Sequence, residues 1–255
     1  GPTCAHVIDI KIGAKSDGTL TAFKGTYLLD TGAMTGFTHS ATAAMTGASH
    51  YRFPHLHIDA YDVVTNKPVA MAYRAPSGPI GNFPTEALMD ELAAIVGMDP
   101  IDLRIKNITE DGEPLPNGLA MPVWGLKKIL TEARQHPAWT ETVPEGRGRG
   151  FAAAYWGGAT LTSNAEIVAN SNATFSVITG SVDLTGTRTT MAQIAAEELG
   201  VEMEQIIITS GDTDSVGHTD GSFGSRTTLT TGTAVMNAAR DVVGKLKEKA
   251  GEFLR

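Results

Sequence analysis

The chain has 255 residues, of which 42% are hydrophobic and 19% charged, a composition that predicts a globular protein with one large domain or two lobes. A net charge of −8 and the lack of an apolar run near ~20 residues argue against nucleic-acid and membrane partners. The only cysteine, Cys4, excludes an internal disulfide or thiolate cluster, so we expect a soluble, cytoplasmic protein.

The first part of the chain predicts an antiparallel hairpin. Residues 5–12 alternate, with Val7, Asp9 and Lys11 on one face and three isoleucines on the other, and a Ser-Asp-Gly turn leads into a second strand over 19–29. Residues 30–49 are small and polar without a clear period, which indicates an irregular, ligand-facing segment or a short helix. A further strand is expected over 55–61. It carries two histidines on one face but no third metal ligand, so no metal site is predicted.

Helices are predicted next. Pro84 suits a first helical turn, and Gly97 stands where that helix should end. Asp99 is placed to cap a second helix that begins at Pro100. A third helix is expected over 124–133.

The segment 137–149 contains two prolines and two glycines and predicts a domain boundary. We therefore expect a first lobe over 1–136 and a second over 150–255. The second lobe shows a strand–helix–strand pattern, which makes the predicted fold α+β, with mixed sheets and packed helices in each lobe. The predicted elements are strands over 165–168, 174–179 and 205–209, a helix over 187–199 and a final helix to about 249.

Three loops could hold an anionic ligand. In the segment 71–81, two prolines and two glycines fix the backbone beside Arg74, although a connector with a solvated arginine is the simpler interpretation. The segments 185–190 and 221–226 each place glycine and hydroxyl side chains before a helix, where free amides attract anions. Helix capping alone explains the first of these equally well.

The polar stretch before the last helix does not match two familiar ligand loops. The Gly-Lys-Ser/Thr ending of a Walker phosphate loop is missing, and Val216 occupies the third ligand position of a calcium loop. We expect Asp212 and Asp214 to shape a turn. Gly224 and Ser225 are better suited to contact a phosphate.

Three segments in the same order resemble the molybdenum-binding large subunit of the xanthine dehydrogenase/aldehyde oxidase family, the molybdenum hydroxylases. The first runs from Ala72 to Asn107 and contains Ala-Tyr-Arg-Ala, Met-Asp-Glu-Leu-Ala and Gly-Met-Asp-Pro. The others, "GSVDLTGTRTTMAQIAAEELGV" and "GDTDSVGHTDGSFGSRTTLTTGTAV", are similar to the family's second molybdenum domain. The resemblance extends over essentially the whole chain.

The resemblance implies a molybdenum–pyranopterin cofactor, often extended with a cytosine nucleotide. It also implies hydroxylation of an aldehyde or N-heteroaromatic carbon with water as the oxygen source. Electrons would leave through 2Fe-2S centres to FAD on partner subunits or domains, in an oligomeric enzyme. The implied cofactor-binding residues are Arg74, Ala75, Thr185, Gly186, Thr187, Arg188, Thr189, Ser222, Phe223, Gly224, Ser225 and Arg226.

The sequence departs from the family pattern at several positions. Thr185 replaces a glutamine that usually precedes the loop glycine, which puts one cofactor hydrogen bond in doubt. Ala75 replaces the cysteine of carbon monoxide dehydrogenases, so copper–molybdenum chemistry is not expected. Pro76 replaces the aromatic residue of xanthine dehydrogenases, which weakens a purine assignment.

The family's catalytic glutamate is expected downstream of this chain, so no catalytic residue is assigned. Glu86 and Glu91 lie on a predicted helix, where carboxylates are usually solvated. We therefore expect a fragment or a split piece of the large subunit, inactive without the remainder of that subunit. The alternatives are a phosphate- or nucleotide-binding module and an assembly scaffold, both without redox chemistry.

Overall fold

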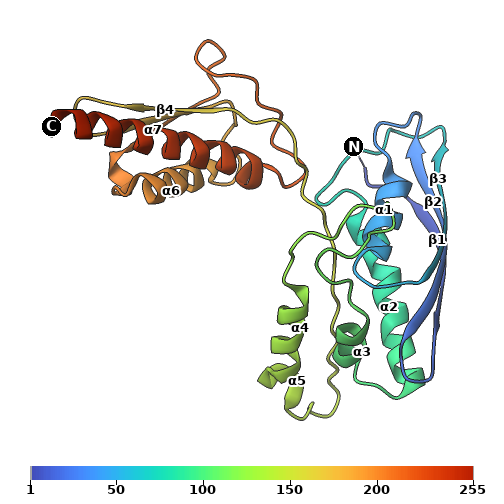
Figure 1. Ribbon diagram of the computed structural model, residues 1–255. Coiled ribbons are helices and arrows are strands. Elements are labelled where there is room, and N and C mark those ends of the chain that lie inside the picture. The colour runs from blue at the N-terminus through green and yellow to red at the C-terminus, as the bar shows by residue number, and fades with distance from the viewer. Residues whose placement is uncertain (1, 255) are drawn as a thin grey trace. The chain divides into compact units, whose positions relative to one another are not determined.

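A computed structural model describes residues 2–254 (Figure 1). The chain divides into two compact units, Gly1–Gly157 and Gly158–Arg255. Each unit contains a three-stranded sheet with one antiparallel and one parallel strand pair, together with packed helices, so the predicted α+β class is confirmed. The division falls after the predicted linker 137–149, because residues 151–156 pack and hydrogen-bond within the first unit.

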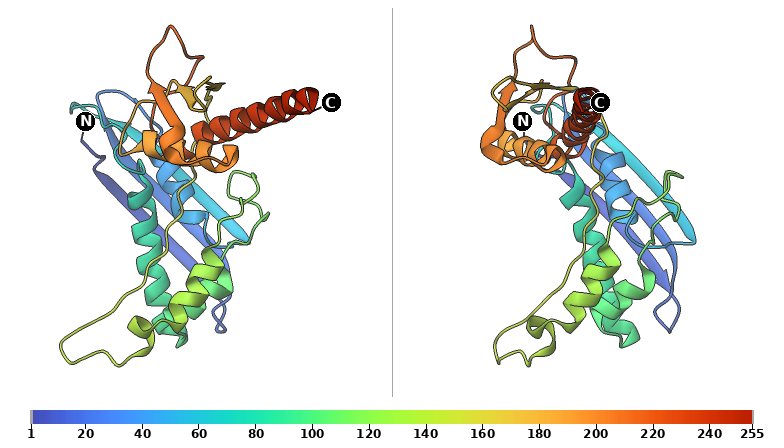
Figure 2. Two further views of the ribbon diagram at one scale, coloured as in Figure 1. Left: turned by 90° about the vertical axis from the view of Figure 1, so that its left-hand side faces the viewer. Right: turned by 60° about the vertical axis from the view of Figure 1, so that its left-hand side comes forward.

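The elements of the first unit are β1 (His6–Ala14), β2 (Leu20–Gly32), α1 (His39–Ala48), β3 (His55–Val64), α2 (Gly78–Val96), α3 (Pro100–Asn107), α4 (Leu126–Gln135) and α5 (Pro137–Thr140). β1 pairs antiparallel with β2, as predicted, and β2 pairs parallel with β3. Figures 1 and 2 show α1 and α2 on the same face of this sheet. The isoleucines of β1 face those helices, which explains the alternation in the sequence. The buried core between sheet and helices includes Phe23, Tyr27, Leu29, Ala43 and Ala48.

α1 and α2 cross at very short range because both contribute glycine to the crossing. A Cβ atom added to Gly81 would lie 1.9 Å from the carbonyl oxygen of Ala43, and one added to Gly47 would lie 2.6 Å from the carbonyl oxygen of Gly81. Any larger side chain at these positions would force the helices apart. The glycines therefore set the spacing between the two helices.

Two local expectations need correction. α2 begins at Gly78, so Pro84 lies inside the helix and not in its first turn. The proline ring removes one amide donor from the helix, a loss that the packing of α2 on α1 and the sheet outweighs. The segment 30–49, for which a short helix was one of two expectations, contains α1 over its last part.

The predicted start of the next helix is confirmed. Asp99 caps α3, where its Oδ1 accepts hydrogen bonds from the amides of Ile101 (2.8 Å) and Asp102 (3.2 Å). Pro100 occupies the first helical position, where no amide donor is needed.

The elements of the second unit are β4 (Ala165–Ala169), β5 (Phe175–Thr179), α6 (Thr187–Leu199), the 3₁₀ turn η1 (Met203–Gln205), β6 (Ile206–Ser210), the π-helical turn η2 (Thr227–Thr231) and α7 (Gly232–Phe253). β5 pairs antiparallel with β4 and parallel with β6. α6 has the predicted bounds, and α7 presents Val235 and Ala239 to the core. Leu246, further along α7, is 45% exposed. Within residues 2–254, no helix is both long and apolar enough to cross a membrane.

The helix crossing yields a first prediction. Gly81→Ala should lower the free energy of unfolding of the first unit by about 3 kcal/mol or more, because its Cβ would overlap the backbone of α1. Gly244→Ala is the matched control, since this helical glycine has nothing within 4 Å of an added Cβ and lies on α7. The control should be neutral or stabilising by about 1 kcal/mol. Urea unfolding of both variants measures the difference, and equal effects would contradict the predicted overlap.

Candidate functional site

The two glycine-containing loops of the second unit line one cavity. The cavity has a volume of about 340 Å³. The loop before α6 and the loop before η2 lie more than thirty positions apart in the sequence and meet here. The lining residues are Leu184, Thr185, Thr187, Ser222, Phe223, Ser225, Arg226, Thr227 and Thr228.

Both loops contain a non-glycine residue with a positive φ angle. Thr185 has φ 65° and is followed by Gly186 at 87°, whereas Gly224 at 64° precedes Ser225 at 60°. A side chain in this left-handed region costs about 1–2 kcal/mol and persists where the surroundings enforce it. Apart from the hairpin residue Ala173, the described non-glycine residues with positive φ all lie in the three predicted ligand loops. Backbone strain in this chain is therefore concentrated where a ligand was predicted.

Arg226 forms the floor of this cavity, fully buried. Its Nη1 donates to the carbonyl oxygens of Asp220 (2.6 Å) and Gly221 (3.1 Å). Its Nη2 donates to the carbonyl oxygen of Thr162 (2.6 Å) and to Ser163 Oγ. These bonds hold the loop before η2 against residues 161–163, a segment that the sequence reasoning did not assign to the site.

The charge of this guanidinium has no carboxylate partner. In the part of the chain that the structure describes, no Asp or Glu oxygen lies within ion-pairing distance of Arg226, and the carboxylate of Asp220 accepts instead from the amide of Thr162 (2.9 Å). Two buried atoms at the cavity, Arg226 Nε and Ser222 Oγ, have no hydrogen-bond partner. A buried cation and an unsatisfied hydroxyl are costly unless a ligand supplies acceptors. The donor set therefore fits an anionic group.

The start of α6 adds backbone donors. Gly186 occupies the N-cap position without a side-chain cap, so the side chain that usually satisfies the first amides is missing. A Cβ atom on Gly186 would meet nothing within 4 Å, which shows that this face of the turn is open. The amide of Arg188 reaches Asp183 Oδ1 only at 3.4 Å.

Not every predicted residue faces the cavity. The guanidinium of Arg188 donates to the carbonyl oxygen of Ile208 (2.8 Å) in β6, and neither it nor Thr189 lines the cavity. Gly224 brings the backbone close to its neighbour, because an added Cβ would lie 2.9 Å from Ala159 Cβ. Asp212 Oδ1 accepts from the amide of Asp214 (3.0 Å), the turn-forming contact expected of it.

A cluster of hydroxyl groups lies next to Arg226 and contacts it through Ser163 Oγ. Thr231 Oγ1 lies 2.7 Å from Ser181 Oγ and 2.9 Å from Ser163 Oγ, and Thr231 is fully buried. These residues come from three separate segments, so no local pattern in the sequence indicated that they meet.

The Arg74 loop of the first unit is exposed and strained. Arg74 is exposed and makes no hydrogen bond or ion pair with other residues of the range 2–254, which fits both a solvated arginine and one that contacts a ligand. The next residue, Ala75, has φ 49°, and Ser77 has φ 61°.

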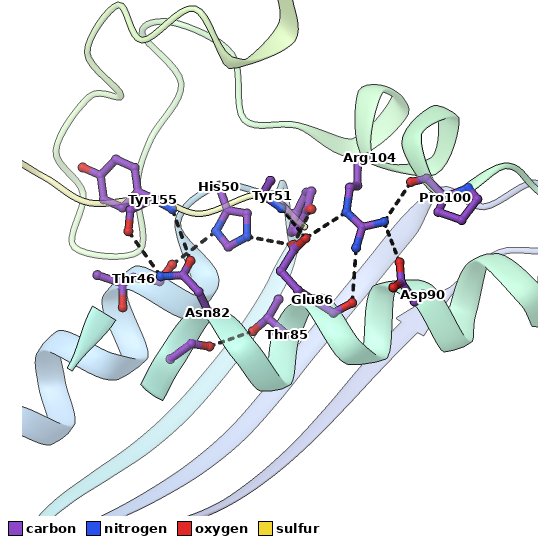
Figure 3. A network of polar contacts seen from close by, with 12 residues as sticks. Thr46, His50, Tyr51, Asn82, Thr85, Glu86, Asp90, Pro100, Arg104 and Tyr155 are labelled. Carbon is purple, nitrogen blue, oxygen red and sulfur yellow. Dashed lines mark hydrogen bonds and ion pairs between the residues drawn. The ribbon is translucent and has the colours of Figure 1, made fainter. Parts of the chain in front are cut away.

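Glu86, expected to be solvated, is in fact buried at the centre of a polar network in the first unit (Figure 3). Its Oε1 accepts from Tyr51 Oη (2.6 Å) and His50 Nε2 (3.1 Å). Its Oε2 accepts from Arg104 Nε (2.9 Å) and the amide of Ala153 (2.6 Å). The expectation failed because its partners come from other segments, which pack over this face of α2.

The network keeps Glu86 ionised. Burial raises the pKa of its carboxyl, but hydrogen bonding and attraction from His50, together with the positive charge of Arg104, outweigh burial and lower that pKa below 4.5. A carboxylate with both oxygens hydrogen-bonded inside the unit cannot reach a substrate. Glu86 therefore has a structural role and is unsuited to act as a general base.

Models of the molybdopterin cofactor-binding domain match residues 1–108 and 126–255. The xanthine dehydrogenase molybdenum-binding subunit of Escherichia coli O157:H7 is 29% identical over 254 residues, which cover 92% of this chain and 34% of that protein. The aldehyde oxidoreductase of Megalodesulfovibrio gigas is 30% identical over 267 residues, which cover 96% of this chain and 29% of that protein.

A solved structure agrees with these matches. The aldehyde oxidoreductase from Desulfovibrio gigas superimposes with a TM-score of 0.80 at 26% identity, covering 94% of this chain and 28% of that chain. The chain thus spans about a third of the length of the relatives it matches.

The Glu86 network yields the second prediction. Glu86→Gln should lower the free energy of unfolding of the first unit by about 3–5 kcal/mol at pH 7, because Arg104 would be left buried with only the exposed carboxylate of Asp90 as an ionic partner. Glu91→Gln on the exposed side of α2 should change it by less than about 0.5 kcal/mol. Chemical denaturation measures both.

The lowered pKa of Glu86 sets the pH dependence of this effect. Its stabilisation is fully present above pH 4.5, the ordinary value, and is lost as the pH falls through the lower pKa of the folded state. The difference between the native chain and Glu86→Gln should therefore shrink below about pH 4.5. A difference that stays constant down to pH 3 would contradict this account.

Proposed function

Because the chain belongs to the molybdopterin cofactor-binding domain family, of the type found in xanthine dehydrogenase and aldehyde oxidoreductase subunits, we propose that its second-unit cavity holds the phosphate-bearing part of a molybdenum–pyranopterin cofactor. One observation carries the proposal. The floor of the cavity combines an uncompensated buried cation, Arg226, with the unpaired hydroxyl of Ser222. A phosphate group would satisfy both.

The residues around the cavity divide into a polar floor and an apolar rim. Leu184 and Phe223 are 55% and 61% exposed at the cavity, where they could lie against a flat ring. Ser222 Oγ and the open amides after Gly186 would donate to phosphate oxygens. Arg226 would act mainly as a fixed positive charge, because its Nη atoms already donate to carbonyl oxygens.

Thr185 modifies this arrangement. Where the family usually has a glutamine, the shorter threonine stands in a left-handed conformation at the cavity wall. A threonine cannot reach as far as a glutamine amide, so we expect the helix-start amides to supply that contact instead.

The cofactor, when bound, supplies the redox chemistry that hydroxylates a carbon with oxygen from water. The protein would bind and orient both the cofactor and a small aldehyde or N-heteroaromatic substrate. We assign Arg74 and Ala75 to the loop that would face the reacting centre, because that loop exposes Arg74 and is strained at Ala75 and Ser77. Glu86 is not assigned as a general base, since its carboxylate is committed to a buried network.

We also propose that the chain acts together with the remainder of a large subunit and with FAD-binding and 2Fe-2S partners in the cytoplasm. The support is that the relatives include a molybdenum-binding subunit and are about three times as long. By itself the chain is expected to bind a phosphate-bearing ligand without hydroxylase activity.

Calorimetric titration of the chain with diphosphate, CMP and ATP tests the cavity. The proposal predicts binding of diphosphate and CMP, without preference for ATP. Ser222→Ala should weaken binding about 5- to 15-fold, the value of one hydrogen bond to a charged group. In the absence of ligand it should raise the free energy of unfolding by about 1 kcal/mol, because alanine removes a buried hydroxyl that has no partner in the protein.

Two further variants complete this test. Arg226→Lys retains the charge and should lower stability more than affinity, because its carbonyl contacts are lost. Lys247→Ala removes an exposed charge on α7 and should leave affinity unchanged. Tight ATP binding that survives Ser222→Ala would instead favour a nucleotide-binding module.

A further inference from the structure

The loop that carries Arg74 has an unusual conformation at its base. Ala75 and Ser77 both have positive φ angles and flank Pro76. The amide of Gly78 closes the turn by donating to the carbonyl oxygen of Ala75 (2.8 Å). Two strained residues in three positions persist only where the surroundings over-determine the backbone.

One buried side chain, His39 on α1, contacts both ends of this loop. Its Nδ1 lies 2.9 Å from Ser77 Oγ, and its Nε2 lies 3.3 Å from the carbonyl oxygen of Ala70. His39 is 2% exposed, and the ring of Phe37 packs edge-on against it with centroids 5.0 Å apart. A single imidazole therefore spans the loop from Ala70 to Ser77.

The chemistry of the acceptors assigns the direction of these bonds. A carbonyl oxygen only accepts, so Nε2 carries the proton that is donated to Ala70. In the neutral ring, Nδ1 then accepts from the hydroxyl of Ser77. This commits the serine hydroxyl to His39, which agrees with Ser77 standing at the N-cap of α2 without capping it.

The loop is exposed above this base. Met71 is 44% and Tyr73 62% exposed, and Arg74 is exposed as well, whereas Ser77 is 7% exposed. His39 therefore contacts the buried base of the loop, and the exposed outer residues of the loop stay available to a ligand. Its sequence position, more than thirty residues before the loop, gave no indication of this role.

We propose that His39 is a positioning residue, which uses Ser77 and the carbonyl of Ala70 to hold the Arg74 loop in the strained conformation needed to meet cofactor and substrate. The structural part of the proposal stands on the contacts alone, and the functional part rests on the proposed function. Asn82 Nδ2 also donates to the carbonyl oxygen of Gly78 (2.8 Å), but within residues 2–254 His39 is the side chain that contacts Ser77 Oγ and the carbonyl oxygen of Ala70.

Two conservative variants separate the two hydrogen bonds. Asparagine places its Oδ1 near the position of Nδ1, so His39→Asn keeps the acceptor for Ser77 and loses the donor to Ala70. Glutamine places its amide nitrogen near Nε2, so His39→Gln keeps the donor to Ala70 and loses the acceptor for Ser77. Glutamine is closer to histidine in volume, so a packing role alone predicts that His39→Gln is the milder change.

Hydrogen–deuterium exchange of the 255-residue chain measures the effect. The amide of Gly78 should exchange about 5- to 10-fold faster in His39→Gln and in Ser77→Ala, the range expected for one lost hydrogen bond. His39→Asn should stay near the native rate at Gly78, and the double variant His39→Gln/Ser77→Ala should be no faster than either single change. Substitution of the exposed His55 by alanine is the control and should leave the loop unchanged.

A slower or equal rate in His39→Gln relative to His39→Asn would overturn the proposal, and so would additive effects in the double variant. In a complete, molybdenum-loaded subunit, His39→Gln should lower kcat at least 10-fold with unchanged metal content. If exchange at Gly78 changes but kcat does not, His39 holds the loop without positioning it for catalysis. That result would overturn the positioning role of His39. Failure of anion binding at the Ser222 cavity is a separate result, because exchange at Gly78 requires no cofactor.

Discussion

The buried ion pair between Glu86 and Arg104 holds the first unit together. Arg104 is fully buried, and besides Glu86 Oε2 it contacts Asp90 Oδ1 (2.8 Å) and the carbonyl oxygen of Pro100 (3.0 Å). Glu86 in turn binds the residues that follow α1 and the amide of Ala153. One carboxylate thus joins α2, α3, the segment that follows α1 and the segment around Ala153. Because each of these charges would be costly to bury alone, the segments are stable only as a set.

The second unit contains the opposite situation. Arg226 is as deeply buried as Arg104, but carbonyl and hydroxyl oxygens replace the carboxylates around it. The same physical rule that makes Arg104 structural is the basis for proposing an anion at Arg226, since that charge has no counter-ion among the described residues. The strained turns at Thr185 and Ser225 bring open backbone and side-chain donors to that position. Burial by itself therefore does not distinguish a structural arginine from a ligand-directed one; the charge of the neighbours does.

Backbone strain also differs between the structural framework and the candidate ligand loops. The framework places glycine at tight positions, as at the crossing of α1 and α2, where a Cβ atom does not fit. The candidate ligand loops instead hold Ala75, Ser77, Thr185 and Ser225 in conformations that glycine would adopt more easily. Buried side chains contact these loops and enforce their conformations. They are His39 in the first unit and Arg226 and Thr231 in the second. Such rigid loops on supporting side chains are suited to hold a ligand in one orientation.

The sequence by itself determined the local structure: the hairpin of β1 and β2, the Asp99 cap, the bounds of α6, and the loops able to approach an anion. These follow from alternation, capping and glycine chemistry, which act over a few residues. It also indicated the family through the order of its motifs. It did not show that α2 continues through Pro84, that Glu86 is buried, or that His39 reaches Ser77. Only the tertiary structure decided which charges are paired, because Glu86 meets partners 18 and 67 positions away and Arg226 meets oxygens 64 positions away. Such contacts form only after the units pack, and no local pattern records them.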